Sequence, residues 1–447
     1  MTRRNRREFL KSCVALGAAG AALPLTRLGM VTAHAQTSGY KALVCVFLFG
    51  GNDANNTIVP IDSRYAAYAG MRGAVALPQA SLLPAGSAGY GLHPALTNVQ
   101  RLYNQNRTAF VFNVGTLVRP TFKLAGGGLN TNQLPRNLYS HSDQTQQWQS
   151  SDPNGGATGW GGRINDITQS QNTGSLPPGI TVNSGNALFL AGTATRGLNF
   201  SNASTAGLFP FGTTAAFAAR KAALQDVLTF DTGLRMVGPA NAVLGSSIQA
   251  MEAFNLALQS VPEPTGFPNT NLGRQLAQVF RIIQARGSLG MQRQIFFAGM
   301  GGFDNHEQLV SNHNNLMTTL DAAIGAFFNA LDTTPNPPAV TLFTESEFNR
   351  TGNTNANVGS DHAWGSHHMV FSNEIRTNTD GSHNFGTFPQ HVLRGPDDAG
   401  DRGYWIPTTA LDQYAATLGG WFGVSDADLG MIFPNLVNFP TTKLGFL

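Results

Sequence analysis

Charged residues and cysteines are scarce in this sequence of 447 residues. Asp, Glu, Lys and Arg make up 12% of the chain, about half the share in typical soluble domains. Of the two cysteines, Cys13 lies in an N-terminal leader and Cys45 in an apolar run. The loss of the leader excludes an internal disulfide and a thiolate metal cage. The hydrophobic fraction of 42% is enough for a large core and excludes disordered and fibrous classes.

An overall basic charge and a second long apolar run are also lacking. The formal net charge is +3, but residues 1–35 hold six basic residues and one acidic residue, and the remainder carries 22 − 24 = −2. A nucleic-acid partner is therefore not expected. No apolar stretch beyond the leader reaches the ~20 residues of a spanning helix, so we expect no stable membrane anchor in the mature chain.

The leader has the features of an export signal. Asn5–Lys11 reads NRREFLK, and an apolar run follows at Cys13–Leu25. Ala33-x-Ala35 suits a signal peptidase. The paired arginines before Phe-Leu-Lys resemble the twin-arginine export signal; an ordinary secretory signal or a basic amphipathic helix is the alternative. We predict a signal peptide over residues 1–35, cleavage after Ala35, the twin-arginine translocase as partner, and a periplasmic or extracellular location.

Strand-like and helix-like segments alternate along the rest of the chain. Ala42–Phe49 is continuously apolar, which fits a strand buried on both faces. A helix at His93–Asn106 and a strand at Ala109–Val114 complete a βαβ unit, and residues 119–213 are expected to form long loops. Further along we predict helices at Ala215–Thr229, Asn241–Gln259, Leu272–Ala285, Glu307–Leu331 and Leu411–Phe422, and strands at Gln294–Ala298, Ala339–Phe343 and His368–Phe371.

These elements predict the α/β class, with a doubly wound, mostly parallel sheet sandwiched by helices. We expect a single domain over residues 36–447, with a loop-rich insertion and helical region at 119–290. Carboxylates and histidines follow three of the predicted strands, and the carboxyl ends of parallel strands meet at one edge of such a sheet. The residues concerned are Asp53, Asp304, His306, Asp361, His362, His367 and His368.

This set of side chains suits divalent metal ions. Carboxylates and imidazoles bind zinc, and carboxylates also bind manganese, magnesium or calcium. The set is large enough for two ions, which would hold the attacking and leaving oxygens of an in-line displacement. The structural alternative is that Asp53 and Asp304 are turn or helix-cap residues.

The motifs also resemble a known family. GGND, GGFDNH, SEFNRT and SDHAWGSHH, with the later DQYAATLGGWFGV and FPNL, resemble the domain-of-unknown-function family fifteen hundred and one, exported proteins grouped with the alkaline-phosphatase and sulfatase superfamily. The resemblance runs from Ala42 to Phe439. It implies an alkaline-phosphatase-like fold with two metal positions and a nucleophile between them.

The resemblance also implies a ligand set. One ion would be held by Asp53, Asp361 and His362. The second would be held by Asp304, His306 and either His367 or His368. Asp304 and His306 are closer in sequence than the matching pair in the superfamily, so His383 and His391 are fallback ligands.

A nucleophile is expected in Asn137–Gln149, at the start of the helix after the second strand. Ser140 is the first candidate and Ser142 the second, because a helix N-terminus helps to hold a transferred anion and a metal would activate the hydroxyl. The alternative is that either serine is simply the N-cap. His141 is a proton shuttle or an outer ligand. The formylglycine motif Cys-x-Pro-x-Arg is missing, which argues against sulfatases of that type.

The function predicted from these residues is an exported, metal-dependent hydrolase of phosphate or sulfate esters. Arg350, and less strongly Arg163, would bind an anionic oxygen, and Glu345 and Glu347 would orient histidines. The substrate would be a small-molecule or polymeric ester. A non-catalytic surface, matrix or assembly protein is the alternative, and a metal-free serine esterase using Ser140 is a weaker one.

Overall fold

The central strand is buried on both faces, as its sequence predicts. The computed structural model describes residues 39–185, 187–200, 214–230 and 237–447; the predicted signal peptide and its cleavage site lie outside them. In strand β1 (Lys41–Leu48), Leu43, Cys45 and Phe47 enter one hydrophobic cluster. Ala42, Val44, Val46 and Leu48 enter the other. Because successive side chains point to opposite faces, β1 lies between the two hydrophobic clusters and contributes to both.

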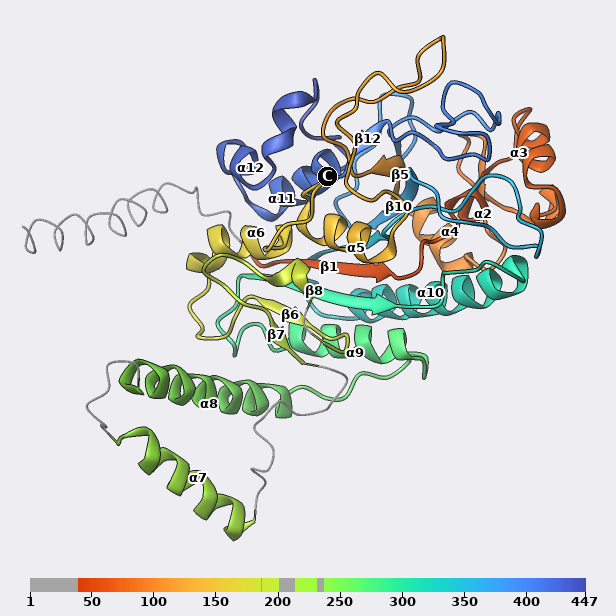
Figure 1. The fold of residues 1–447 in the computed structure, drawn as a ribbon. Helices are drawn as coiled ribbons and strands as arrows, with labels where there is room; N and C mark the ends of the chain where they lie inside the picture. Colours follow the sequence, from red (N-terminus) through yellow and green to blue (C-terminus); the bar gives the residue numbers. More distant parts are fainter. Residues whose placement is uncertain (1–38, 186, 201–213, 231–236) are drawn as a thin grey trace, which may run out of the picture. The chain divides into compact units, whose positions relative to one another are not determined.

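Among the described residues, the main sheet has nine strands in the order β11-β5-β10-β9-β1-β8-β6-β7, with β12 paired to β5 (Figure 1). β10 runs antiparallel to β5 and β9, and the other pairs are parallel. The carboxyl ends of β1, β8 and β9 therefore meet at one edge. The strands are β5 (Thr108–Gly115), β6 (Gly179–Thr181), β7 (Leu198–Asn199), β8 (Arg293–Met300), β9 (Ala339–Glu345), β10 (Ser366–Phe371), β11 (Asn384–Phe385) and β12 (Thr409–Ala410).

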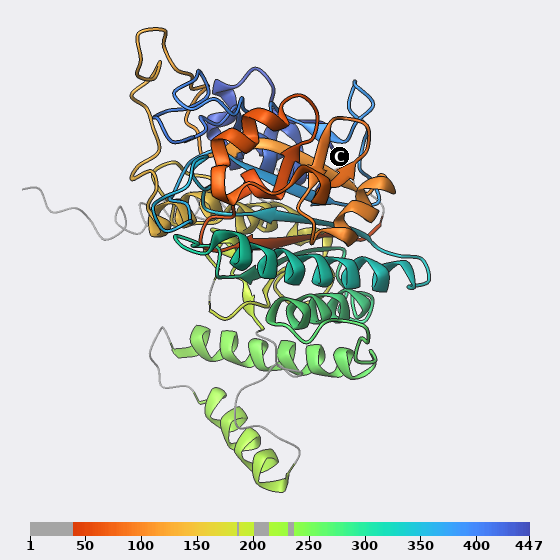
Figure 2. The same cartoon turned by 90° about the vertical axis from the view of Figure 1, so that its right-hand side faces the viewer.

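Helices cover both faces of this sheet (Figure 2). One face is covered by α4 (Thr97–Asn104), α9 (Asn271–Gln284) and α10 (Leu309–Asp332), and α8 (Val237–Gln259) adds residues to the same hydrophobic cluster. The other packs against α5 (His141–Ser150), α6 (Trp160–Thr168), α11 (Leu411–Phe422) and α12 (Asp426–Ile432). The expected doubly wound, mostly parallel α/β sheet is thus confirmed.

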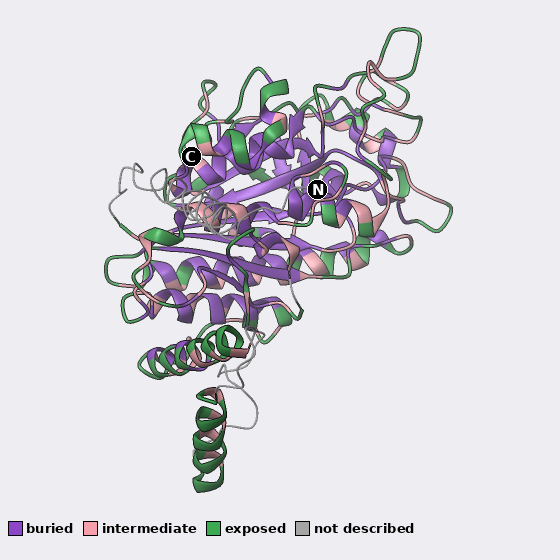
Figure 3. Cartoon of the chain, turned by 60° about the vertical axis from the view of Figure 1, so that its left-hand side comes forward, coloured by how far each residue is buried: buried purple, intermediate pink, exposed green. Residues whose placement is uncertain are grey.

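Several smaller elements complete the described fold. Helices α2 (Ala54–Thr57) and α3 (Tyr65–Arg72) follow β1. A second sheet has the order β2-β4-β3, with bounds Ile58–Pro60, Tyr90–Leu92 and Leu83–Ala85. Helix α7 (Ala215–Leu228) has no buried residue (Figure 3). In the described part of the chain, no helix is both long and apolar enough to cross a membrane.

The expectation of long loops over residues 119–213 is wrong in part. Besides α5, a helix that was expected to begin in Asn137–Gln149, this region contains α6 and β6, and β6 joins the main sheet beside β8. Trp160 and Ile164 of α6 are buried against the sheet, but the glycine- and asparagine-rich sequence around them hides that spacing. β6 has three residues, too few for a period-two pattern to be visible.

Candidate metal centre

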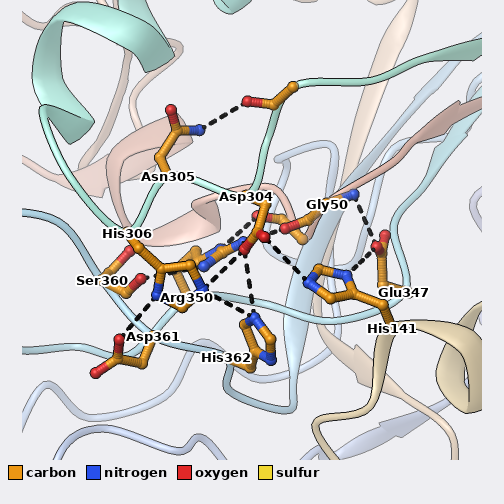
Figure 4. A network of polar contacts seen from close by, with 12 residues as sticks. Gly50, His141, Asp304, Asn305, His306, Glu347, Arg350, Ser360, Asp361 and His362 are labelled. Atoms are coloured by element: carbon orange, nitrogen blue, oxygen red, sulfur yellow. Dashed lines mark hydrogen bonds and ion pairs between the residues drawn. The ribbon is translucent and has the colours of Figure 1, made fainter.

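Polar side chains gather at the edge where β1, β8 and β9 end. Asp304 and His306 follow β8, and Glu347 follows β9. His362 precedes β10, which enters this edge in the opposite direction. His141 is the first residue of α5. Segments far apart in sequence thus bring three imidazoles around the carboxylate of Asp304 (Figure 4).

The three imidazoles direct their Nε2 atoms at that carboxylate. Nε2 of His306 lies 3.0 Å and Nε2 of His362 lies 3.3 Å from Asp304 Oδ1. Nε2 of His141 lies 3.4 Å from Asp304 Oδ2, and the Nε2 atoms of His306 and His362 are 3.1 Å apart. His141, Asp304 and His362 offer ligand atoms that all lie within 4.8 Å of one another. In the described part of the chain, no other such group was found.

The opposite nitrogen of each ring is held by an oxygen. His306 Nδ1 lies 3.0 Å from Asp361 Oδ1, and His141 Nδ1 lies 2.9 Å from Glu347 Oε1. His362 Nδ1 donates to the carbonyl oxygen of Tyr139 at 2.8 Å. A carbonyl or carboxylate oxygen only accepts, so each neutral ring carries its proton on Nδ1 and keeps a lone pair on Nε2.

This arrangement fits a bound cation. Lone pairs that converge on a carboxylate repel one another unless a positive charge lies between them. Nε2 of His141 is moreover buried with no hydrogen-bond partner. Histidines that bind metals commonly donate their other nitrogen to a carboxylate or carbonyl, as all three do here. His141, Asp304 and His362 therefore form a chemically suitable ligand set. His306 lies outside that group of three, but its Nε2 is 3.0 Å from Asp304 Oδ1 and makes it a further ligand candidate.

Arg350 keeps the carboxylate ionised. Burial favours a higher pKa for Asp304, but the hydrogen bond and charge of Arg350 outweigh it and lower the pKa to about 2. Arg350 is fully buried and also donates to the carbonyl oxygens of Gly50, Gly51 and Ser360. Four of its five N–H groups are thereby used. Arg350 therefore holds the site together and does not face a substrate.

The ring of Phe348 packs against two of the imidazoles. Its fully buried ring lies 4.8 Å from that of His141 and stacks 4.6 Å from that of His362. Burial lowers the pKa of His362. The pKa of His141 is raised, chiefly by its hydrogen bond to Glu347.

The site opens into a pocket of about 390 Å³. This volume is within the range of small-molecule sites, roughly 300–1,000 Å³. His306, Asp361 and His362 form its polar side. The remaining lining residues are Tyr139, Ala399, Gly400 and Tyr404.

Several predicted ligands lie elsewhere. Asp53 is buried and ion-paired with buried Arg72. His367 and His368 are buried within β10, where burial lowers the pKa of each to about 3. His367 Nδ1 accepts from the backbone N–H of Asn113 at 3.0 Å. The predicted arrangement of two metal positions is therefore not assembled.

The predicted nucleophile is also engaged elsewhere. The hydroxyl of Ser140 donates to Asp143 Oδ2 at 2.7 Å and caps α5. Ser142 Oγ lies 3.2 Å from Ser140 Oγ. Arg163 donates to the carbonyl oxygens of Thr158 and Ser150.

The remaining candidates also lie apart from the cluster. The carboxylate of Glu345 is buried against the thiol of Cys45. Of the fallback ligands, His383 Nε2 is paired with Asn106, and His391 packs 5.5 Å from Trp405. Sequence reasoning missed Arg402, whose Nη1 lies 2.5 Å from Asp361 Oδ2, and the pocket residues Tyr139 and Tyr404. Tyr139 lies within Asn137–Gln149, where the serines drew attention instead, and no motif surrounds Arg402 or Tyr404.

Comparison with known proteins gives a family match. Residues 40–371 match the family described as "Protein of unknown function (DUF1501)". No curated protein matches the chain. Two similar solved structures are crystal structures of the C-terminal periplasmic domain of EcEptC from Escherichia coli, one of them in complex with Zn. Each is 9% identical to this chain, with a TM-score of 0.36, and the match covers 88% of this chain. It covers 85% of the chain solved with Zn and 84% of the other.

The resemblance drawn from the motifs needs correction. It was expected to reach Phe439, but the match ends at residue 371, so DQYAATLGGWFGV and FPNL lie outside it. The expected grouping with alkaline phosphatases and sulfatases is not part of the family's description either.

Proposed function

Because the chain belongs to the family described as "Protein of unknown function (DUF1501)", a description that assigns no activity, we propose a function from the site itself. The protein is a metal-dependent hydrolase of phosphate or related esters. One observation carries this proposal: the Nε2 atoms of three histidines converge on Asp304 while each Nδ1 is held by an oxygen.

A single divalent ion is proposed, held by His141, His306, His362 and Asp304. Nitrogen and oxygen ligands in this number suit zinc, with manganese, magnesium or calcium as alternatives. When bound, the ion supplies Lewis-acid polarisation of an ester oxygen. The chain's own part is to keep each Nδ1 protonated, so that each Nε2 is available at a fixed place.

The charges around the site favour an anionic ester. The carboxylates of Asp304, Glu347 and Asp361 contribute −3, and the guanidinium groups of Arg350 and Arg402 contribute +2. With a divalent ion the sum is −3 + 2 + 2 = +1. A positive site facing an open pocket attracts phosphate or sulfate groups.

Water is the proposed nucleophile. The serine-bound intermediate expected from the sequence requires Ser140 to leave Asp143, with which its hydroxyl is hydrogen-bonded. A metal-free serine esterase requires a hydrogen bond between this serine and a histidine, and Asp143 occupies that place. The geometry therefore favours attack without a covalent intermediate on serine.

Elemental analysis of the purified protein beside Asp304→Asn tests this proposal. We expect about one zinc or manganese ion per chain in the wild type and a loss of most of it in the variant. Asp332→Asn, which removes an exposed surface carboxylate, is the matched control and should keep the ion. Hydrolysis of p-nitrophenyl phosphate or p-nitrophenyl sulfate should follow metal content. Wild-type protein that binds no ion after incubation with zinc, manganese, magnesium or calcium would favour the non-catalytic surface or assembly protein.

Export is proposed on the sequence of the leader. The motif Asn5–Lys11 and the site after Ala35 support transport through the twin-arginine translocase to the periplasm or beyond. Replacement of Arg6 and Arg7 by lysine should leave the protein inside the cell in a fractionation experiment. Unchanged export of that variant would indicate an ordinary secretory signal.

A further inference from the structure

We propose that Tyr139 and Tyr404 form a binding wall for a flat, uncharged aromatic group on the organic side of the ester. This inference rests on the proposed function, because it assigns the other half of the same substrate. It makes the protein selective for aryl esters over small alkyl esters.

The two tyrosine rings contact each other and line the same pocket as two of the proposed metal ligands. Their centroids are 5.3 Å apart and their planes are tilted by 50°. Both are half-buried and line the same pocket as His306 and His362. An ester group at the histidines would therefore place its organic group against aromatic surface, which favours another aromatic ring in an offset or edge-to-face contact.

Tyr139 is held in a costly backbone conformation. Its φ is +73°, and a bulky residue in the left-handed region is uncommon. Its backbone N–H donates to Gln144 Oε1 at 2.5 Å, and its carbonyl accepts from His362 Nδ1 at 2.8 Å. The same residue thus orients a metal ligand through its backbone and forms the wall with its ring. Strain of this kind is concentrated at functional sites.

Neighbouring residues keep the wall open and uncharged. A Cβ at Gly400 would lie 2.9 Å from Cδ2 of the Tyr404 ring, so any other residue there would push the ring aside. Among the described residues that line the pocket, Asp361 is the only carboxylic acid, and none is a lysine or an arginine. A second anionic group on the substrate would find no cationic partner on this wall.

Calorimetric titration of the zinc-loaded protein with phenylphosphonate and methylphosphonate tests the inference without turnover. We expect the wild type to bind phenylphosphonate at least tenfold more tightly. Tyr404→Ala should reduce this ratio to about one, whereas Tyr404→Phe, which keeps the ring, should retain it. Metal content is measured in all three proteins and should be equal.

The outcomes separate this inference from the proposed function. Equal binding of both phosphonates by the wild type, or an unchanged ratio in Tyr404→Ala, would overturn the aromatic wall and leave the hydrolase in place. Protein that binds neither phosphonate and cleaves no ester would overturn both.

Discussion

Two adjacent residues at the start of α5 have different roles, which single substitutions should distinguish. Ser140 caps the helix, whereas His141 turns its ring toward Asp304. Ser140→Ala should cost about 1 kcal/mol of stability, as the loss of an N-cap does, and leave metal affinity unchanged. His141→Ala should weaken metal binding at least tenfold. Denaturant unfolding and metal titration measure these effects. A Ser140→Ala protein that keeps its metal but loses all hydrolysis would instead support the serine nucleophile.

At the same scale, the sequence indicated which residues gather but not their roles. Asp304, His306 and His362 could be found because each lies close to a strand end. Asp361 has the sequence position of a metal ligand, yet its Oδ1 contacts His306 and its Oδ2 contacts Arg402. Asp53 also follows a strand, but buried Arg72 lies beside it. Tertiary packing decides which cation lies beside a given carboxylate, and a local sequence pattern does not predict it.

The N-terminus of helix α11 contains a carboxyl group whose titration should control stability. Asp412 is almost fully buried, and burial raises its pKa to about 7, against the opposing hydrogen bond from Ser151. Its ordinary value is 3.8. Between these values the unfolded chain releases the proton and the folded chain retains it. Stability should therefore fall as the pH rises from about 4 to about 7, and stay lower above that.

Asp412→Asn tests this titration at the level of the element. The amide is neutral at every pH and still accepts the hydrogen bond from Ser151. The variant should match the wild type at pH 4 and exceed it by a few kcal/mol at pH 8, on the basis of about 1.4 kcal/mol per pKa unit. Denaturant unfolding at both pH values measures the difference. A variant that is less stable at pH 8 would show that the helix N-terminus stabilises the charge more than burial opposes it.

Elements with a long periodic signal were predictable, and short ones were not. β1, β8 and β9 each have seven or eight residues, and their apolar runs were visible. β6 and β7 have three and two residues, and β6 pairs with β8, which is far away in sequence. α4 begins at Thr97, later than expected, because Pro94 lies in a turn closed by a hydrogen bond from Leu96 N–H to the His93 carbonyl oxygen. Turn geometry of this kind overrides helical spacing.

At the scale of the whole molecule, a bound ion would add a link between helix α5 and the ends of the strands, which already pack together in the core. Asp304 lies 304 − 141 = 163 residues after His141, and His362 lies 362 − 304 = 58 residues after Asp304. Ligand binding to the folded state alone stabilises it by about 2.7 kcal/mol when the free ion is at 100 times its Kd. Zinc should therefore raise the Tm of the protein, and a chelator should lower it again.

The variants used for metal analysis show whether this stabilisation arises at the candidate centre. Asp304→Asn removes the carboxylate to which all three imidazoles point, so its Tm should not respond to zinc. Asp332→Asn alters only a partly exposed ion pair with Arg107, and its Tm should respond as the wild type does. Scanning calorimetry at matched zinc concentrations measures the three responses. An equal rise in Tm in all three proteins would mean that zinc binds elsewhere. The ion would then not link helix α5 to the strand ends.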